Sequence, residues 1–88
     1  MPRVVITHDV VDLQRWLAGK AERAEIISAL GSNVVDTVAL DGSNKIALIA
    51  DINDLAALQA MLDSPPPELA AMMEKHGVLP PFTAYVER

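Results

Sequence analysis

The sequence predicts an α+β domain in which strands and helices follow the order β-α-β-β-α-β. Two observations predict this order. Runs rich in β-branched and aromatic residues occur four times along the chain, and the middle two are separated by a short turn cluster. Elsewhere, apolar residues recur at three- and four-residue spacing, which is typical of amphipathic helices. The 88 residues leave room for one domain, positions 1–88.

The first strand and first helix are expected near the N-terminus. The segment RVVITH, positions 3–8, is rich in β-branched residues and is typical of a strand. Asp12 is a good N-cap, and Val11 and Trp16 occupy the N′ and N4 positions of a hydrophobic staple. The apolar spacing then continues toward Gly31, which suits a helix end. We therefore expect a single helix in this stretch.

A β-hairpin and a second helix should follow. The runs NVVDTVAL and KIALIADI, positions 33–40 and 45–52, are separated by the turn cluster DGSN. Asn53 or Asp54 can then cap a helix over DLAALQAML. This helix places its larger apolar residues on one side, namely Leu55, Leu58, Met61 and Leu62.

The stretch SPPPELAAMMEKHGVLPP, positions 64–81, holds five of the six prolines. Proline suits the first turn of a helix and not its interior, so the second helix should break after Leu62 and restart near Glu68. Gly77 can end the restarted helix in the left-handed conformation. The segment FTAYVER, positions 82–88, should form a short closing strand.

This order of elements is the split βαβ arrangement of ferredoxin-like domains. In it, a four-stranded antiparallel sheet carries two helices on one face, with the first and third strands central. Strand alternation assigns a set of mostly large and apolar residues to the helix side. That set comprises Val4, Ile6, His8, Val34, Asp36, Val38, Leu40, Ile46, Leu48, Ala50, Phe82, Ala84 and Val86.

The other face of the sheet is expected to carry Val5, Thr7, Val35, Thr37, Ala39, Ala47, Ile49, Thr83 and Tyr85. A sheet face open to water should be distinctly polar. This one is small and mildly apolar, and it has no charge near its middle. We therefore expect it to pack on the same face of a second copy in a two-fold homodimer.

Composition excludes several classes of protein. Seven basic residues against twelve acidic ones give a net charge of −5, which argues against nucleic acid as a partner. No run of about 18 apolar residues is present, and the N-terminus lacks a signal-peptide pattern. We expect a cytoplasmic protein that makes no membrane contact. With no cysteine and two histidines, disulfides, thiolate chemistry and a metal site are not expected.

Three segments carry a resemblance to a known superfamily. They are ITHDVVDLQRW, KIALIADINDLAALQAML and SPPPELAAMMEKHGVLPP. In these segments the chain resembles the dimeric α/β-barrel superfamily, which includes antibiotic-biosynthesis monooxygenase-like domains, small cyclases and uncharacterised bacterial proteins. The resemblance implies two ferredoxin-like subunits joined by their sheets, each with a small apolar cavity between sheet and helices. For an enzyme, it implies oxygenation, isomerisation or cyclisation without a cofactor.

His8 is the candidate catalytic base. It stands at the end of a central strand with helix-facing parity, and the unperturbed pKa of histidine lies near neutrality. The alternative is a histidine that caps the strand end or bonds a backbone carbonyl. Trp16 and Met72 are candidate walls of the cavity. Trp16 could stack on a flat substrate or fill the gap between helix and sheet, and Met72 suits an irregular cavity.

Asp36 and His76 are further candidate pocket residues, and each has a plain alternative. Asp36 could act as an acid, but inward charges on edge strands commonly guard against unwanted strand pairing. His76 could face the cavity or serve as a positive charge in the last helical turn. Tyr85 could donate a hydrogen bond to a substrate carbonyl, but it lies on the expected dimer face, which favours an interface role.

Two functions follow as alternatives. The first is a small dimeric enzyme or binder that acts on a hydrophobic small molecule, with His8 as the base. The second is a non-catalytic dimerisation or ligand-sensing module, since no catalytic pair or nucleophile motif is present in the sequence. An apolar pocket with His8 facing it favours the first, and a filled core with His8 outside favours the second.

Overall fold

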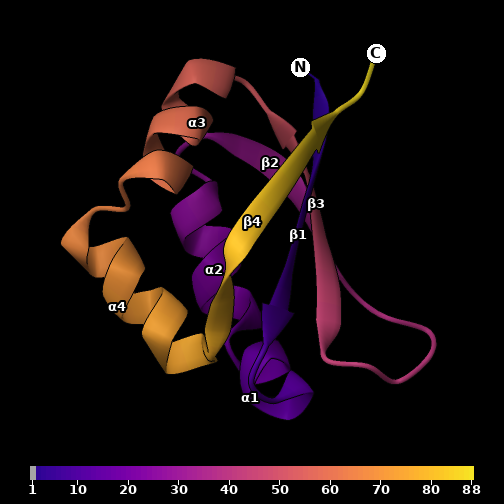
Figure 1. The fold of residues 1–88 in the computed structure, drawn as a ribbon. Helices are drawn as coiled ribbons and strands as arrows, with labels where there is room; N and C mark the ends of the chain where they lie inside the picture. Colours follow the sequence, from indigo (N-terminus) through magenta and orange to yellow (C-terminus); the bar gives the residue numbers. More distant parts are fainter. Residues whose placement is uncertain (1) are drawn as a thin grey trace.

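The computed structural model describes residues 2–88, which form one antiparallel sheet with helices on one of its faces (Figure 1). The order of strands in the sheet is β2-β3-β1-β4, so the first and third strands are central, and the ferredoxin-like topology is confirmed. The strands are β1 (Arg3–Val10), β2 (Gly31–Val38), β3 (Lys45–Ile52) and β4 (Val78–Val86). The helices are α1 (Leu13–Ala18), α2 (Lys20–Ile27), α3 (Leu55–Asp63) and α4 (Pro67–His76).

Four expected features of the helix ends are confirmed. The side chain of Asp12 accepts a hydrogen bond from the backbone N–H of Gln14 at 2.9 Å, and that of Asp54 accepts one from Ala57 at 3.0 Å. The proline break separates α3 from α4 at the expected place. Gly77 ends α4 with a φ of 73°, the left-handed conformation that glycine adopts without strain.

The expected single first helix is instead two, α1 and α2, which meet at Gly19. The imidazole of His76 lies against this residue so closely that a Cβ on Gly19 would come 2.2 Å from Nε2. Gly31 is not a helix end but the first residue of β2. Here glycine is needed because a Cβ would lie 1.9 Å from the backbone oxygen of Asp51. Both glycines serve close packing, which the local pattern does not reveal.

The closing strand is longer than expected, because β4 begins at Val78 and includes both prolines. Its register against β1 shifts: Thr7 pairs with Thr83, but Asp9 pairs with Leu79. Residues 80–82 therefore bulge opposite His8, which pairs with β3 alone. Proline is tolerated here because β4 is an edge strand and can lack ladder donors. The bulge leaves His8 unpaired on its β4 side.

The expectation that Leu40 faces the helices is wrong. Strand β2 ends at Val38, and Leu40 lies in the following loop with a relative exposure of 105%. Val38 is itself 44% exposed. The reason is that the β2–β3 loop extends away from the helices, so no helix covers this end of the hairpin (Figure 1).

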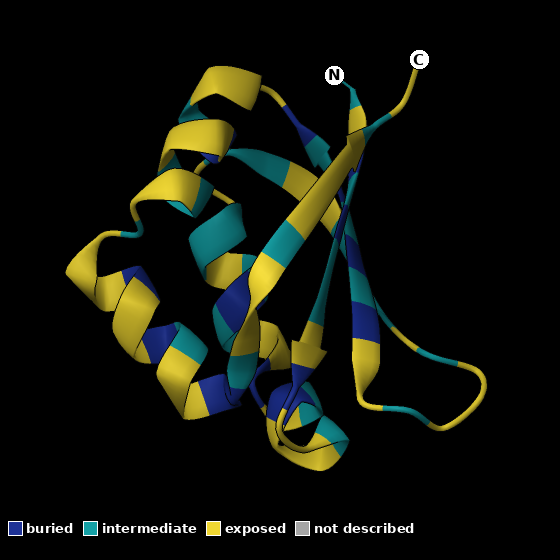
Figure 2. Ribbon diagram, in the orientation of Figure 1, coloured by how far each residue is buried: buried dark blue, intermediate teal, exposed yellow. Residues whose placement is uncertain are grey.

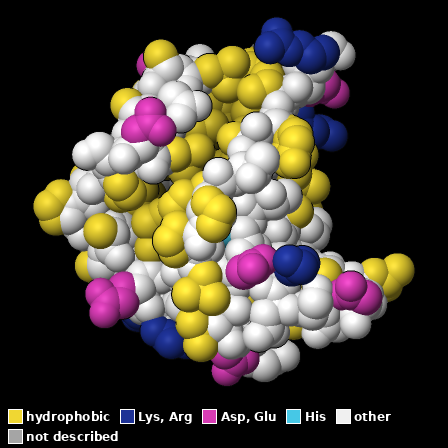
Figure 3. Space-filling model, in the orientation of Figure 1, with side chains coloured by type: hydrophobic (Ala, Val, Ile, Leu, Met, Phe, Trp, Pro, Cys, Tyr) yellow, Lys and Arg dark blue, Asp and Glu magenta, His cyan; other side chains and the backbone are white. Residues whose placement is uncertain are grey.

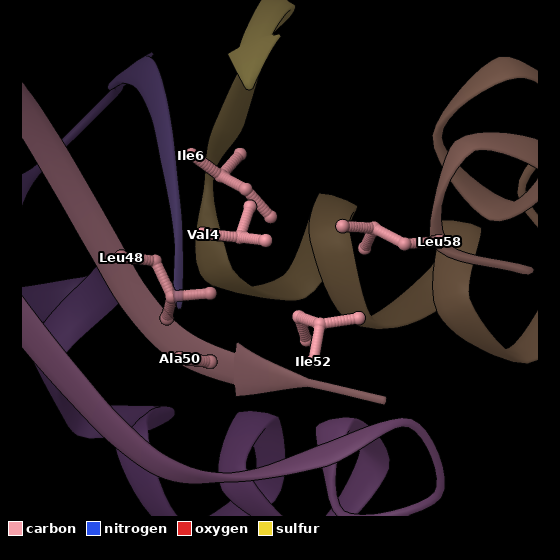
Figure 4. Close-up of a cluster of buried hydrophobic side chains, with 6 residues drawn as sticks. All are labelled: Val4, Ile6, Leu48, Ala50, Ile52 and Leu58. Carbon is pink, nitrogen blue, oxygen red and sulfur yellow. The ribbon is translucent and has the colours of Figure 1, made fainter. Parts of the chain in front are cut away.

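The core lies between the helix side of the sheet and the helices, and buried residues gather there (Figure 2). One cluster joins both central strands to α3 (Figure 4), and its members are Val4, Ile6, Leu48, Ala50, Ile52 and Leu58. A second cluster lies toward α1 and consists of Val10, Trp16 and Ile46. The set that was expected to face the helices includes the strand members of both clusters except Val10 and Ile52, which continue the same alternation at the strand ends.

The contact between Gly19 and His76 predicts a specific stability effect. Replacing Gly19 with alanine should lower the free energy of unfolding by about 1–3 kcal/mol, because the new methyl overlaps a buried ring. Urea unfolding measures the effect, with Lys20→Ala as the matched exposed control. In a His76→Ala background the cost of Gly19→Ala should disappear. An undiminished cost in that background would contradict the steric explanation.

Candidate functional site

A cavity of about 80 Å³ lies between the helix side of the sheet and the helices. Its walls come from β1, β3 and β4 on one side and from α2, α3 and α4 on the other. Among the lining residues that the structure describes, all except His8 and Arg23 are hydrophobic. Figure 3 shows hydrophobic side chains gathered in a hollow between β4 and the α3–α4 side. The cavity therefore opens at the surface of the molecule.

The size of the cavity limits what it can hold. About 10–15 Å³ is enough for one water molecule, and a cavity of about 150 Å³ can enclose benzene. The present cavity lies between these limits, so a larger ligand would fill it and extend through its mouth. Met61 and Met73 are half-buried residues of the lining. Their flexible side chains can adapt to such a ligand.

His8 lines the cavity where β4 bulges away from β1. Its Nδ1 lies 2.9 Å from the carbonyl oxygen of Asp9, and a carbonyl only accepts, so Nδ1 carries the proton and Nε2 holds a lone pair. The ring meets Trp16 and Phe82 edge-on, with centroids 6.3 and 5.4 Å away. Burial lowers the pKa of His8. The imidazole is thus neutral near pH 7, the form that can accept a proton.

Arg23 also lines the cavity, although its sequence context does not mark it as a candidate site residue. It is almost fully buried, and its Nε and Nη2 each lie 3.3 Å from Oδ1 of Asp36. Its guanidinium carbon lies 4.0 Å from the centroid of the Trp16 ring, a cation–π contact. Nη1 also donates to the carbonyl oxygen of Trp16 at 2.5 Å. The available signal was that Arg23 lies seven residues after Trp16, on the same helical side.

Asp36 faces the helices, as alternation predicts, and its side chain is only 1% exposed. Its role here is to balance the charge of Arg23. A buried guanidinium without a carboxylate partner would be strongly destabilising. Burial lowers the pKa of Arg23 and Asp36 raises it again, while arginine stays protonated in either case. The pair joins β2 to α2.

His76 lies in the last turn of α4, as expected, but it is neutral. Its Nδ1 lies 3.2 Å from Nη1 of Arg23, which can only donate, so Nδ1 accepts and the proton sits on Nε2. Burial, and then the charge of Arg23, lower the pKa of His76, while Glu22 opposes them. The positive charge at this helix end comes instead from Arg15, which donates to the carbonyls of Glu74 and Lys75.

The structure brings most of the expected site residues together, but in two layers. His8 and Met72 line the cavity together with Arg23. Trp16, Asp36 and His76 are not part of the lining; they surround Arg23. Within residues 2–88, no three His, Asp or Glu side chains converge as a metal site would require.

The opposite face of the sheet carries a second hollow, of about 460 Å³. It lies over the ends of the central strands and includes Thr7, Thr37 and Thr83. His8 borders this hollow as well as the apolar cavity, and it lies where the pairing between β1 and β4 is interrupted. Tyr85 lies on the same face, as expected, and is 59% exposed.

None of the helices in residues 2–88 has the length and apolar character needed to cross a membrane.

Comparisons with known proteins connect this architecture to solved structures. Neither a protein-family model nor a curated protein matches the sequence. A structure named antibiotic biosynthesis monooxygenase matches with a TM-score of 0.66 and 14% identity, over 100% of this chain and 97% of that one. A protein of Agrobacterium tumefaciens matches with a TM-score of 0.68 and 16% identity, over 100% and 92%.

A candidate antibiotic biosynthesis monooxygenase of Deinococcus radiodurans matches with a TM-score of 0.59 and 13% identity, over 97% of this chain and 90% of that one. At these identities the likeness concerns the fold. The chain therefore has the ferredoxin-like fold of antibiotic biosynthesis monooxygenase-like structures, and the expected resemblance is confirmed at that level.

The two neutral histidines predict a pH dependence of stability. Because folding lowers the pKa of His8 and of His76, the unfolded chain binds protons at higher pH than the folded chain does. The free energy of unfolding should be greatest above about pH 6.5 and should fall as the pH drops from there through the lowered folded-state pKa.

Urea unfolding at about pH 7.5 and about pH 5 measures this loss. His76→Gln keeps an acceptor for Arg23 but cannot be protonated, so the loss should be smaller in this variant. His8→Gln provides the parallel measurement for the other histidine. Equal losses in all three proteins would contradict the assignment.

Proposed function

We propose that this protein binds an apolar small molecule in the cavity and that His8 accepts a proton from it. One observation carries the proposal. His8 presents an unprotonated Nε2 at a cavity whose other described lining residues, Arg23 apart, are hydrophobic. An apolar pocket with a few convergent polar groups is the usual form of a ligand site. A neutral imidazole in such a pocket suits a general base.

The chain itself supplies the group that accepts the proton. His8 takes the proton from an acidic C–H or O–H of the ligand and becomes a cation, and the ligand becomes an anion beside it. Returning the proton to a different atom gives an isomerisation, and attack by the anion on a second group of the same molecule gives a cyclisation. An oxygenation would also consume dioxygen. The names of two structures with this fold support that third possibility.

Filling the cavity should abolish binding. Ala50 is a buried residue of the lining on β3, and replacing it with isoleucine would occupy much of the cavity. The matched control is Ala47→Ile, on the same strand with the opposite orientation, because Ala47 borders the hollow of the open face. Ethylbenzene and acetophenone should raise the melting temperature of the parent protein and of Ala47→Ile, but not of Ala50→Ile.

A second comparison separates binding from catalysis. His8→Gln should retain the ligand-induced rise in melting temperature and lose conversion of any bound molecule that mass spectrometry shows to be turned over. Conversion that survives in His8→Gln would refute the role of His8 as base. Equal melting shifts in Ala50→Ile and Ala47→Ile would place the ligand outside the cavity and contradict the proposal.

A second candidate function, a dimerisation module, is supported by the open face of the sheet. The register places Val35, Ile49, Val5 and Tyr85 side by side in one apolar row that crosses all four strands. The neighbouring row is small, with Thr37, Ala47, Thr7 and Thr83. A row of this kind suits contact with an equal row on a second copy, because a two-fold interface pairs the same patch of both subunits.

A lysine in the apolar row should separate such a dimer. Val35 is 50% exposed, so Val35→Lys would bury a charge in the interface without disturbing the core. Leu40→Lys is the matched control, because Leu40 is also an exposed apolar residue but lies in the loop beyond β2. Sedimentation equilibrium should give a dimer for the parent protein and Leu40→Lys, and a monomer for Val35→Lys. A monomeric parent protein would refute the dimer.

A further inference from the structure

We propose that Arg23 selects the ligand's head group: it favours an apolar molecule with a neutral acceptor oxygen, such as a ketone, and disfavours a carboxylate. This inference rests on the proposed function, because it concerns the same cavity. Its starting point is that a lining that is hydrophobic apart from His8 contains one buried cation, Arg23.

The hydrogen bonds of Arg23 leave one donor free. A guanidinium has five N–H bonds. Nε–H and one N–H of Nη2 are directed to Asp36, and the two of Nη1 are directed to the carbonyl of Trp16 and to His76. The second N–H of Nη2 has no partner among residues 2–88. Because Arg23 lines the cavity, this N–H is the donor that it can offer to a ligand.

Asp36 decides the charge that the ligand can carry. Its carboxylate already balances the guanidinium, so the pair as a whole contributes no net charge to the cavity. A ligand carboxylate would enter as an unbalanced buried anion near Asp36, which is costly in an apolar site. A ketone oxygen can accept the free N–H and brings no charge. The pair therefore favours a neutral acceptor.

Arg23 is also held rigidly. Its guanidinium lies over the Trp16 ring at 4.0 Å, and the edge-on ring of His8 lies 6.3 Å from the same indole. A donor fixed in this way loses little freedom when a ligand binds. A carbonyl bonded to Arg23 becomes more polarised, and the C–H bonds next to it become more acidic. Those C–H bonds would lie in the same cavity as His8 Nε2.

Three probes of similar size test the head-group preference: ethylbenzene, acetophenone and benzoate. The readout is the indole N–H resonance of Trp16, the single tryptophan, in a protein NMR titration. Acetophenone should bind at least about tenfold more tightly than ethylbenzene, because it gains a hydrogen bond to a charged donor. Benzoate should bind more weakly than either.

Two variants test whether the pair of Arg23 and Asp36 causes the head-group preference. Asp36→Asn keeps the shape and an acceptor for Arg23 but removes the balancing charge, so benzoate should bind at least about tenfold more tightly than in the parent protein. Arg23→Met combined with Asp36→Leu removes both charges and leaves none unpaired. In that protein acetophenone should lose its advantage, while ethylbenzene should still bind.

The outcomes separate two failures. Equal affinities of the parent protein for acetophenone and ethylbenzene, or an unchanged benzoate affinity in Asp36→Asn, would overturn the role of Arg23 and leave the cavity as an apolar site. Absence of binding by all three probes would overturn the proposed function, and this inference with it. The comparison of the three probes in the parent protein decides the head-group preference even if neither variant folds.

Discussion

The buried guanidinium of Arg23 is the contact on which the rest of the structure depends. It belongs to α2 and holds Asp36 of β2, Trp16 of α1 and His76 of α4. A domain of this size buries only about 60–65% of its unfolded surface, so its core alone is thin. A charge in that core demands that every partner stay in place, since a missing partner leaves an orphaned charge. A buried ion pair need not add stability, but this one ties α2 to β2 and gives the cavity a polar end.

The two prolines of β4 account for the bulge, and the bulge determines the surroundings of His8. Two prolines in an edge strand remove ladder donors, and the strand departs from β1 for three residues opposite His8. Without that departure, the side of His8 toward β4 would be closed by regular pairing. The imidazole instead meets Phe82 and Trp16 edge-on and bonds the carbonyl of Asp9. Its protonation state follows from the backbone and from burial, and it needs no carboxylate partner to orient it.

The features that depend on nearby residues could be predicted from the sequence. The caps at Asp12 and Asp54, the end of α4 at Gly77 and the faces of the central strands all follow from short patterns. What could not be predicted depends on partners that are distant in the sequence. Gly19 is required because His76 packs against it 57 positions later, and Gly31 because β3 passes close by. Arg23 was missed because an arginine on a helix is normally solvated. His8, Trp16, Asp36, Met72 and His76 were found by parity and residue type, but only the structure separates the two that line the cavity from the three that surround Arg23.

His8 lies where the pairing of β1 with β4 is interrupted, and it takes part in the spaces on both sides of the sheet. The imidazole borders the apolar cavity on one side and the wide hollow on the other. Whatever occupies either space changes the solvation of the same ring, and with it the ease of protonating that ring. Thermodynamic linkage makes such an effect reciprocal. If a partner bound to the open face strengthens ligand binding in the cavity by some factor, then a ligand in the cavity strengthens binding of that partner by the same factor. The ring of His8 is thus a wall that the apolar cavity and the hollow of the open face share.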